Sequence, residues 1–204
     1  DDARGAISQF EAIPRDSWQI GKGDLRFRFR YNGHILGASF IELDLGGKRF
    51  VFSGDIGRPE DELLGPPERP EKADVLLLES TYGNRVHPDT DIEALLADHI
   101  KETIRERGVC IIPSFAVERL QTVMFLLWKL LKTNRIAPLP VYVDSPMGEN
   151  VLDLFERFPH WHRLSMEDYQ GMRRHMEIIS EYRDTWKAID DPRPKVVVAG
   201  SGML

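Results

Sequence analysis

Two alternating segments joined by a pair of glycines are the feature that most constrains what this chain can fold into. Residues 40–45 and 48–52 alternate apolar with polar side chains, and Gly46 and Gly47 join them. This pattern predicts an antiparallel β-hairpin. A hairpin returns the chain to the end of the sheet where it began. His34, before the first strand, and Asp55, after the second, can therefore converge at one sheet edge.

A third candidate residue follows the next apolar run. Residues 75–78 are wholly apolar, which predicts a short strand covered on both faces, with Glu79 at its carboxyl end. An imidazole and carboxylates at one sheet edge form the mixture of ligands that suits zinc. Each residue alone has an ordinary explanation, since histidines beside glycines are common in turns. The combination of the three favours a metal site.

Composition places the chain among ordinary globular proteins. Of its 204 residues 42% are hydrophobic and 29% charged. No apolar run is long enough to span a bilayer and no signal-peptide pattern opens the chain, so we expect no membrane partner. The single cysteine, Cys110, lies in an apolar run, which predicts a buried thiol and a reducing, cytoplasmic location. The net charge of −6 argues against a protein that coats nucleic acid without regard to sequence. It does not argue against a nuclease, because bound metal ions reverse the negative potential of the carboxylates that hold them.

The second half of the chain carries the pattern of a parallel sheet. An apolar strand at residues 109–112 is followed by a long amphipathic helix and by a second strand at 141–143. Strand–helix–strand at this spacing predicts a Rossmann-like parallel arrangement. A capping box at residues 90–93 opens an earlier helix. Further helices are expected at 147–158 and 165–187, and a last strand at 196–199.

Two other patterns have competing explanations. Residues 26–30 alternate arginine with phenylalanine, so three arginines share one face of a strand. The ordinary explanation is a solvated face, and the sharper one is a phosphate-facing stripe.

His160 and His162 have the spacing of some metal sites, but they are far from the acidic candidates in sequence. We expect them to be surface histidines.

Three motifs resemble those of a known family. Gly-His-Ile-Leu-Gly-Ala at 33–38, Ser-Gly-Asp-Ile-Gly-Arg at 53–58 and Glu-Ser-Thr-Tyr-Gly at 79–83 look like the third and fourth metal motifs and motif A of the β-CASP nucleases. These proteins have a metallo-β-lactamase fold and cut or trim RNA, and sometimes DNA. The likeness covers nearly the whole chain. It implies an α/β fold: the end of a metallo-β-lactamase αββα sandwich at 1–86 and a β-CASP domain with a parallel sheet at 87–204.

The resemblance also implies roles for the three candidate residues. Asp55 would bridge two zinc ions, His34 would bind one of them, and Glu79 would support the site by pairing with a motif B histidine. The family's N-terminal His-x-His-x-Asp-His cluster has no match here, and its motif B and C histidines would follow Leu204. We therefore expect an internal piece of a longer protein, which alone binds zinc poorly and hydrolyses little.

Substrate-binding residues are expected at the carboxyl ends of the parallel strands, where ligands bind in open sheets. By resemblance, serines there donate hydrogen bonds to a nucleic-acid backbone and Arg119 contacts a phosphate. For each serine the alternative is helix or turn capping. Glu118 departs from the family, whose members commonly have glycine there, and this leaves the backbone geometry at Arg119 open. The expected contacts are Ser114, Arg119, Ser145, Ser201 and Gly202.

The function favoured by these observations is zinc-dependent cleavage of RNA phosphodiester bonds, internally or from an end. One alternative is a non-catalytic relative that binds RNA or a protein partner, although intact His34, Asp55 and Glu79 count against it. Another is a small-molecule metallohydrolase, which would not need a second domain. The resemblance also allows single-stranded DNA as substrate and a homodimer as the assembly.

Overall fold

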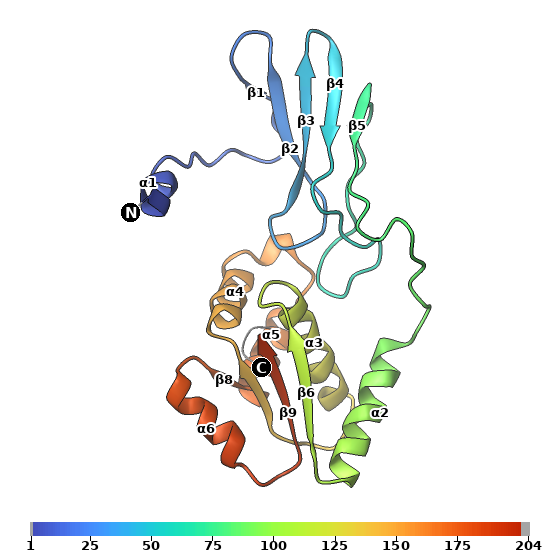
Figure 1. The fold of residues 1–204 in the computed structure, drawn as a ribbon, viewed down its shortest axis with the longest axis vertical. Helices are drawn as coiled ribbons and strands as arrows, with labels where there is room; N and C mark the ends of the chain where they lie inside the picture. The colour runs from blue at the N-terminus through green and yellow to red at the C-terminus, as the bar shows by residue number, and fades with distance from the viewer. Residues whose placement is uncertain (1, 201–204) are drawn as a thin grey trace. The chain divides into compact units, whose positions relative to one another are not determined.

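The computed structural model describes residues 2–200, apart from the side chain of Tyr182. The described residues divide into two compact units, each with its own sheet (Figure 1). One unit contains residues 2–61 and 65–84, and the other contains residues 62–64 and 85–200. The assignment of residues 1–86 and 87–204 to two family domains stays a prediction.

The first unit is a five-stranded sheet preceded by a short helix, α1 (Asp2–Ile7). Its strands pair in chain order, antiparallel except for the last, which is parallel to its neighbour. They are β1 (Gln19–Ile20), β2 (Arg26–Tyr31), β3 (Ser39–Leu45), β4 (Lys48–Phe52) and β5 (Val75–Leu77).

The predicted hairpin is confirmed as β3 and β4. Leu45 pairs with Lys48, so that Gly46 and Gly47 form the two-residue turn. The φ angles of these glycines are +57° and +77°. Two consecutive positive φ angles give the turn a twist that matches the twist of the strands, and glycine adopts them without steric penalty.

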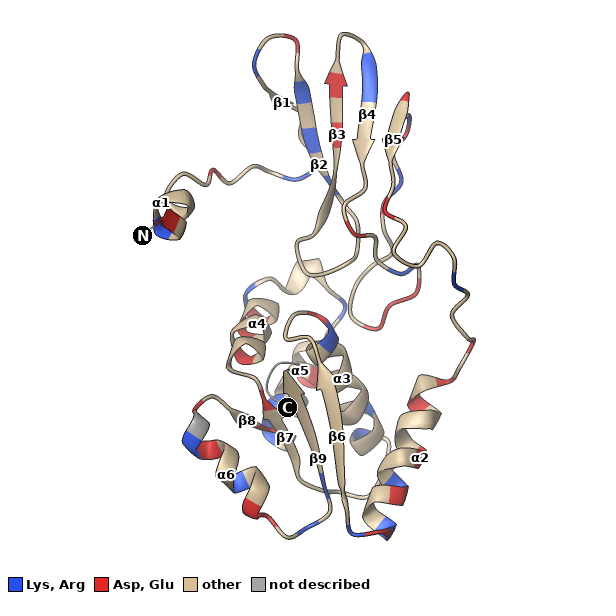
Figure 2. Cartoon of the chain, in the orientation of Figure 1, with Lys and Arg blue, Asp and Glu red and all other residues tan. Residues whose placement is uncertain are grey.

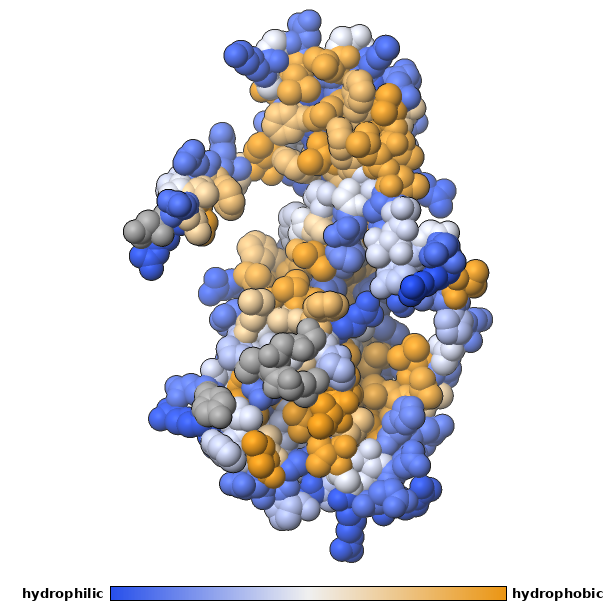
Figure 3. Space-filling model, in the orientation of Figure 1, coloured by the Kyte–Doolittle hydropathy of each residue, from blue (hydrophilic) through white to orange (hydrophobic). Residues whose placement is uncertain are grey.

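The prediction that residues 75–78 are covered on both faces is wrong. β5 is the edge strand of the sheet, and Val75, Leu76 and Leu77 are 42–50% exposed. Hydrophobic residues are prominent on the surface over this sheet (Figure 3). A run of apolar residues indicates a strand that favours burial, but other elements must supply the cover. Among the described residues none packs over β5 closely enough to bury it.

Arg26 of β2 is exposed, but Arg28 and Arg30 form no solvated face, because their side chains are only 12% and 16% exposed. Their carboxylate partners also argue against a phosphate-facing stripe. In the antiparallel register Arg26 lies opposite Asp44 of β3, and Arg28 lies opposite Glu42. Basic and acidic residues therefore lie side by side on β2 and β3 (Figure 2). Glu42 is fully buried against Arg28, and the ring of Trp18 lies 4.6 Å from the Arg28 guanidinium. Each of the three arginines has a carboxylate partner: Arg26–Asp44, Arg28–Glu42 and Arg30–Glu68.

The second unit confirms the predicted Rossmann-like parallel sheet. Its strands lie in the order β6-β9-β7-β8 and all pairings are parallel. The strands are β6 (Val109–Ser114), β7 (Val141–Asp144), β8 (Glu177–Ile179) and β9 (Lys195–Gly200). The helices are α2 (Ile92–Arg105), α3 (Arg119–Lys132), α4 (Pro146–Arg157), α5 (Met166–His175) and α6 (Tyr182–Asp190), with a 3-10 turn, η1 (Pro159–Trp161).

The core of this unit lies between the sheet and its helices. The apolar face predicted for α3 is buried or half-buried, and most residues of the two central strands, β7 and β9, are buried. Buried side chains include Leu120, Met124, Leu127 and Leu130 of α3, Leu152 and Phe155 of α4, Val143 of β7, and Val196 and Val198 of β9. No helix among the described residues is long and apolar enough to cross a membrane.

Three local predictions in this unit need correction. The single helix expected at 165–187 is two helices separated by β8, because the β-branched pair at 178–179 pairs with β7 instead. The N-cap of α2 is Asp91, which accepts a hydrogen bond from the Ala94 amide, so the cap is one residue later than the capping box. Cys110 is half-buried, and this burial raises the pKa of its thiol.

Candidate metal and nucleic-acid sites

His34 and Asp55 converge as the hairpin predicts. Nε2 of His34 lies 4.0 Å from Oδ2 of Asp55, although 20 residues separate them in the chain. Their side chains are 45% and 73% exposed, so both can reach a ligand from solvent. The residues come from the loops that precede β3 and follow β4, at one end of the hairpin.

Asn32 joins these two loops, and sequence reasoning missed it. Its side-chain amide donates to the carbonyl of Ser53 at 3.2 Å, and its Oδ1 accepts from the backbone amide of His34 at 3.3 Å. Asn32 is almost completely buried, so these hydrogen bonds replace ones that water would otherwise supply. An asparagine directly before Gly-His was the available signal, but its long-range partner is not visible in the sequence.

Close backbone contact explains one glycine in the second motif. A Cβ atom on Gly57 would lie 1.9 Å from the carbonyl oxygen of Gly33, well inside van der Waals contact. The Gly57 amide donates to the Asn32 carbonyl at 2.8 Å. Because any other residue at position 57 would clash, only glycine allows the loop before β3 and the loop after β4 to approach this closely. This contact fixes the loops that carry His34 and Asp55.

Glu79 contacts the loop that carries Asp55. Its carboxylate accepts hydrogen bonds from the backbone amides of Ile56 and Thr81, both at 3.1 Å. These bonds, that from Ile56 foremost, lower the pKa of Glu79. Its own amide donates to Oγ of Ser53 at 2.9 Å. Glu79 thus braces the residue next to Asp55, and Ser53 is a second supporting residue that the sequence did not reveal.

The donor set of His34 and Asp55 fits part of a zinc site. Two atoms that each lie about 2.1 Å from one tetrahedral ion are roughly 3.4 Å apart. The observed separation of 4.0 Å is slightly larger, and small rotations of two exposed side chains can close the difference. Structural and catalytic zinc sites use three or four protein ligands. Residues 2–200 contain no cluster of three or more side chains suited to a metal ion, so a zinc site at His34 and Asp55 would need further ligands.

Two of the predicted substrate-binding serines lie at the carboxyl edge of the second sheet. Ser114 ends β6 and Ser145 follows β7, on either side of β9. Both hydroxyl groups make local hydrogen bonds. Ser145 caps α4 by accepting from the Gly148 amide at 3.1 Å, and Ser114 donates to the Phe115 carbonyl at 3.3 Å. A nucleic-acid contact by either serine stays a prediction. Ser201 and Gly202 lie outside the described residues.

Arg119 begins α3 at the same edge, directly after a strained turn. Glu118 has φ +64° and ψ −52°, and the Arg119 amide donates to the Val117 carbonyl at 2.8 Å. These are the features of a γ-turn with positive φ, a rare and strained conformation. Glycine adopts positive φ most readily, so the glycine that the resemblance leads us to expect at position 118 would fit this turn without strain. The Arg119 side chain is exposed, and no described carboxylate forms an ion pair with it.

His162 is not available as a metal ligand. Its Nε2 lies 2.8 Å from the Phe155 carbonyl, and its Nδ1 accepts from the Leu164 amide at 3.1 Å. Both ring nitrogens are therefore used within the fold. The expectation of two surface histidines holds for His160, which is exposed, and is wrong for His162, which is half-buried with its ring 4.8 Å from that of Phe155.

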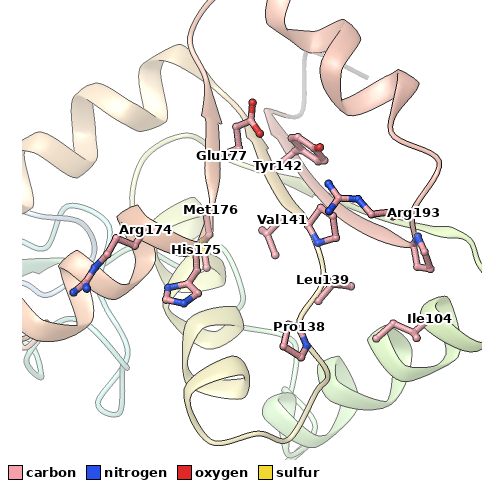
Figure 4. Close-up of a pocket in the computed structure, with 12 residues that line it drawn as sticks. Ile104, Pro138, Leu139, Val141, Tyr142, Arg174, His175, Met176, Glu177 and Arg193 are labelled. Carbon is pink, nitrogen blue, oxygen red and sulfur yellow. The ribbon is translucent and has the colours of Figure 1, made fainter.

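A cavity of about 810 Å³ lies at the opposite edge of the second sheet, where the strands begin (Figure 4). Tyr142 and Arg193 line it, and both bind Asp191: the tyrosine hydroxyl donates to this carboxylate at 2.8 Å, as does the guanidinium. The cavity lies at the amino ends of the strands, and is therefore separate from the Ser114–Ser145 edge at their carboxyl ends. The hydroxyl of Tyr142 and the guanidinium of Arg193 already have a hydrogen-bond partner in Asp191.

The chain is similar in sequence to several known proteins. The family model described as Beta-Casp domain matches residues 120–204. A ribonuclease of Thermus thermophilus is 32% identical over the whole chain. An endoribonuclease of Schizosaccharomyces pombe is 30% identical over the whole chain, and cleavage and polyadenylation specificity factor 73 of Drosophila melanogaster is 28% identical over 88% of it. The chain spans 48% of the first relative and 27% of each of the other two.

Proposed function

The chain belongs to the β-CASP family of metallo-β-lactamase-fold proteins, and from this premise we propose that the whole protein hydrolyses phosphodiester bonds of RNA with the help of zinc. The observation that carries the proposal is the approach of His34 to Asp55, two metal-ligand types held 4.0 Å apart by two loops. The names of the relatives, ribonuclease and endoribonuclease, support RNA as the substrate class. Internal cleavage and trimming from an end are both compatible with this chemistry.

In this proposal His34 and Asp55 hold the metal. His34 would hold it through Nε2, the ring nitrogen nearest Oδ2 of Asp55, and Asp55 would hold it through its carboxylate oxygens. When bound, zinc ions in such sites supply Lewis-acid activation of water and of the phosphoryl group. Glu79 is a positioning residue: its carboxylate holds the Ile56 amide, and so the loop of Asp55, in place.

RNA is held through its phosphates. Arg119 is an exposed cation at the carboxyl edge of a parallel sheet, where ligands commonly bind. Guanidinium groups bind phosphate oxygens through charge-assisted hydrogen bonds. Ser114 and Ser145 flank the same edge, and the family resemblance adds Ser201 and Gly202. Together these residues form the proposed path of the RNA backbone.

Metal binding by the full-length protein tests the proposal without relying on turnover. Metal-free protein is dialysed against zinc, and bound zinc is quantified per chain. We expect up to two ions in the wild type, and a loss of at least one in His34→Ala and in Asp55→Ala, because each change removes a ligand. His160→Ala, which removes an exposed histidine outside the site, is the matched control and should bind zinc as the wild type does.

Circular dichroism of each variant separates loss of ligand from loss of fold. Folded Asp55→Ala protein that binds as much zinc as the wild type, at the same affinity, would contradict the role of Asp55.

A further inference from the structure

Phe115 is an aromatic residue whose ring is exposed to solvent, although hydrogen bonds hold its backbone in place. It directly follows β6, and its side chain is 73% exposed. Its carbonyl accepts hydrogen bonds from the Leu120 amide at 3.1 Å and from the Ser114 hydroxyl at 3.3 Å. The buried Gln121 side chain donates to the next carbonyl, that of Ala116, at 3.1 Å. The turn is therefore anchored on both sides of the exposed ring.

The surroundings of Phe115 match what an unpaired nucleic-acid strand requires. Arg119, an exposed cation, starts α3 four residues later in the chain, and the γ-turn at Glu118 links it to the same anchored segment. Met147, at the first turn of α4, is another large apolar side chain left 61% exposed near this sheet edge. A cation for the backbone and an aromatic face for a base are the two elements by which proteins bind single strands without reading sequence.

We propose that Phe115 is a platform on which an unpaired RNA base stacks, beside the phosphate contact of Arg119. This inference rests on the proposed function and narrows its substrate to single-stranded RNA. A base within a duplex is already stacked on its neighbours, so its face is not available to the ring. All four bases have such a face, and for this reason the platform tolerates any sequence.

Binding measurements on the full-length, metal-free protein test this inference, because removal of the metal prevents cleavage. The probes are a fluorescein-labelled single-stranded RNA of mixed sequence, the same strand with abasic sites, and an RNA duplex of equal length. Phe115→Leu keeps an apolar side chain but removes the aromatic face, and Phe115→Trp keeps the face. Trp186→Leu is the matched control, because Trp186 is an aromatic residue on α6 that is 53% exposed.

For Phe115→Leu we expect affinity for the single strand to fall about 5- to 150-fold, the range typical of one stacked base. Phe115→Trp should bind within about twofold of the wild type, and Trp186→Leu should bind as the wild type does. Affinity for the duplex should not change in any variant. Because the platform needs a base, the abasic strand should bind wild type and Phe115→Leu about equally weakly.

Several results would overturn the inference. Folded Phe115→Leu protein that binds the single strand as tightly as the wild type would show that no base stacks on Phe115. The same conclusion follows if Phe115→Leu loses affinity equally for the normal and the abasic strand. A loss of thermal stability that Phe115→Trp does not restore would show a packing role instead. A wild-type protein that binds none of the three probes would contradict the proposed function itself, and not the platform alone.

Discussion

Glu118 holds a backbone conformation that disfavours every residue except glycine. Its positive φ places the β-carbon against the backbone, and such positions cost about 1–3 kcal/mol. They persist where surrounding contacts determine them, and here bonds from Leu120 to Phe115 and from Thr122 to Glu118 fix the turn on both sides. The strain thus lies at the same sheet edge as Arg119, within the proposed substrate path.

Glu118→Gly is expected to stabilise the protein, unlike most substitutions of a buried residue. Relief of the positive φ should raise the free energy of unfolding by about 1 kcal/mol, or the melting temperature by about 2–4 °C. Glu118→Ala is the matched control, since it removes the same side chain but keeps the unfavourable φ. Thermal denaturation followed by circular dichroism measures both. A glycine variant no more stable than the alanine variant would contradict the strain.

Single residues differ in how far their roles can be predicted from sequence. The approach of His34 to Asp55 was predictable, because a hairpin with a Gly-Gly turn brings its two flanks together by local geometry. Asn32 and Ser53 were not predictable. Their roles depend on hydrogen bonds to residues 21 and 26 positions away, which no local pattern encodes. The sequence indicated a turn before Arg119, but its conformation could not be predicted, because it depends on the positive φ of Glu118.

Among the helices and strands, periodicity predicted what is local and failed where the partner is distant. The hairpin and the parallel strand–helix–strand unit follow from regular spacing of apolar residues. β8 was missed because a strand of three residues between two helices has too few positions to show alternation. The charged face of β2 was misjudged because its pairing partner, β3, supplies carboxylates in matching register.

A hydrogen bond between two helices is expected to make the stability of the fold decrease at alkaline pH. Tyr169 of α5 donates a hydrogen bond to Glu156 of α4 at 3.1 Å, and burial raises the pKa of Tyr169 to about 12 from 10. The folded protein therefore keeps a proton that the unfolded chain loses between these values. Stability should fall as pH rises from 10 to 12.

Urea denaturation at several pH values measures this dependence. The Tyr169→Phe variant lacks the titrating hydroxyl and should show a smaller loss of unfolding free energy over the same range, although its stability at neutral pH is lower because it lacks the hydrogen bond. An equal loss in wild type and variant would assign the alkaline sensitivity to other groups.

At the scale of the whole molecule, the proposed metal ligands and the proposed RNA contacts lie in different units. The chain contains His34 and Asp55 in one unit and the predicted RNA contacts in the other, and it spans 48% of the Thermus thermophilus ribonuclease. Neither unit alone holds a complete metal site among the described residues. The activity we propose is therefore that of the full-length protein.

Cleavage of RNA by the full-length protein is the most direct test of this account. A labelled single-stranded RNA is incubated with metal-free protein, with and without added zinc, and the products are resolved by length. We predict cleavage by the wild type only when zinc is present, and a loss of at least about a hundredfold in rate for Asp55→Ala, since this change removes a carboxylate that we propose holds the metal. Zinc-dependent cleavage by Asp55→Ala at the wild-type rate, or undiminished cleavage by metal-free protein, would contradict it.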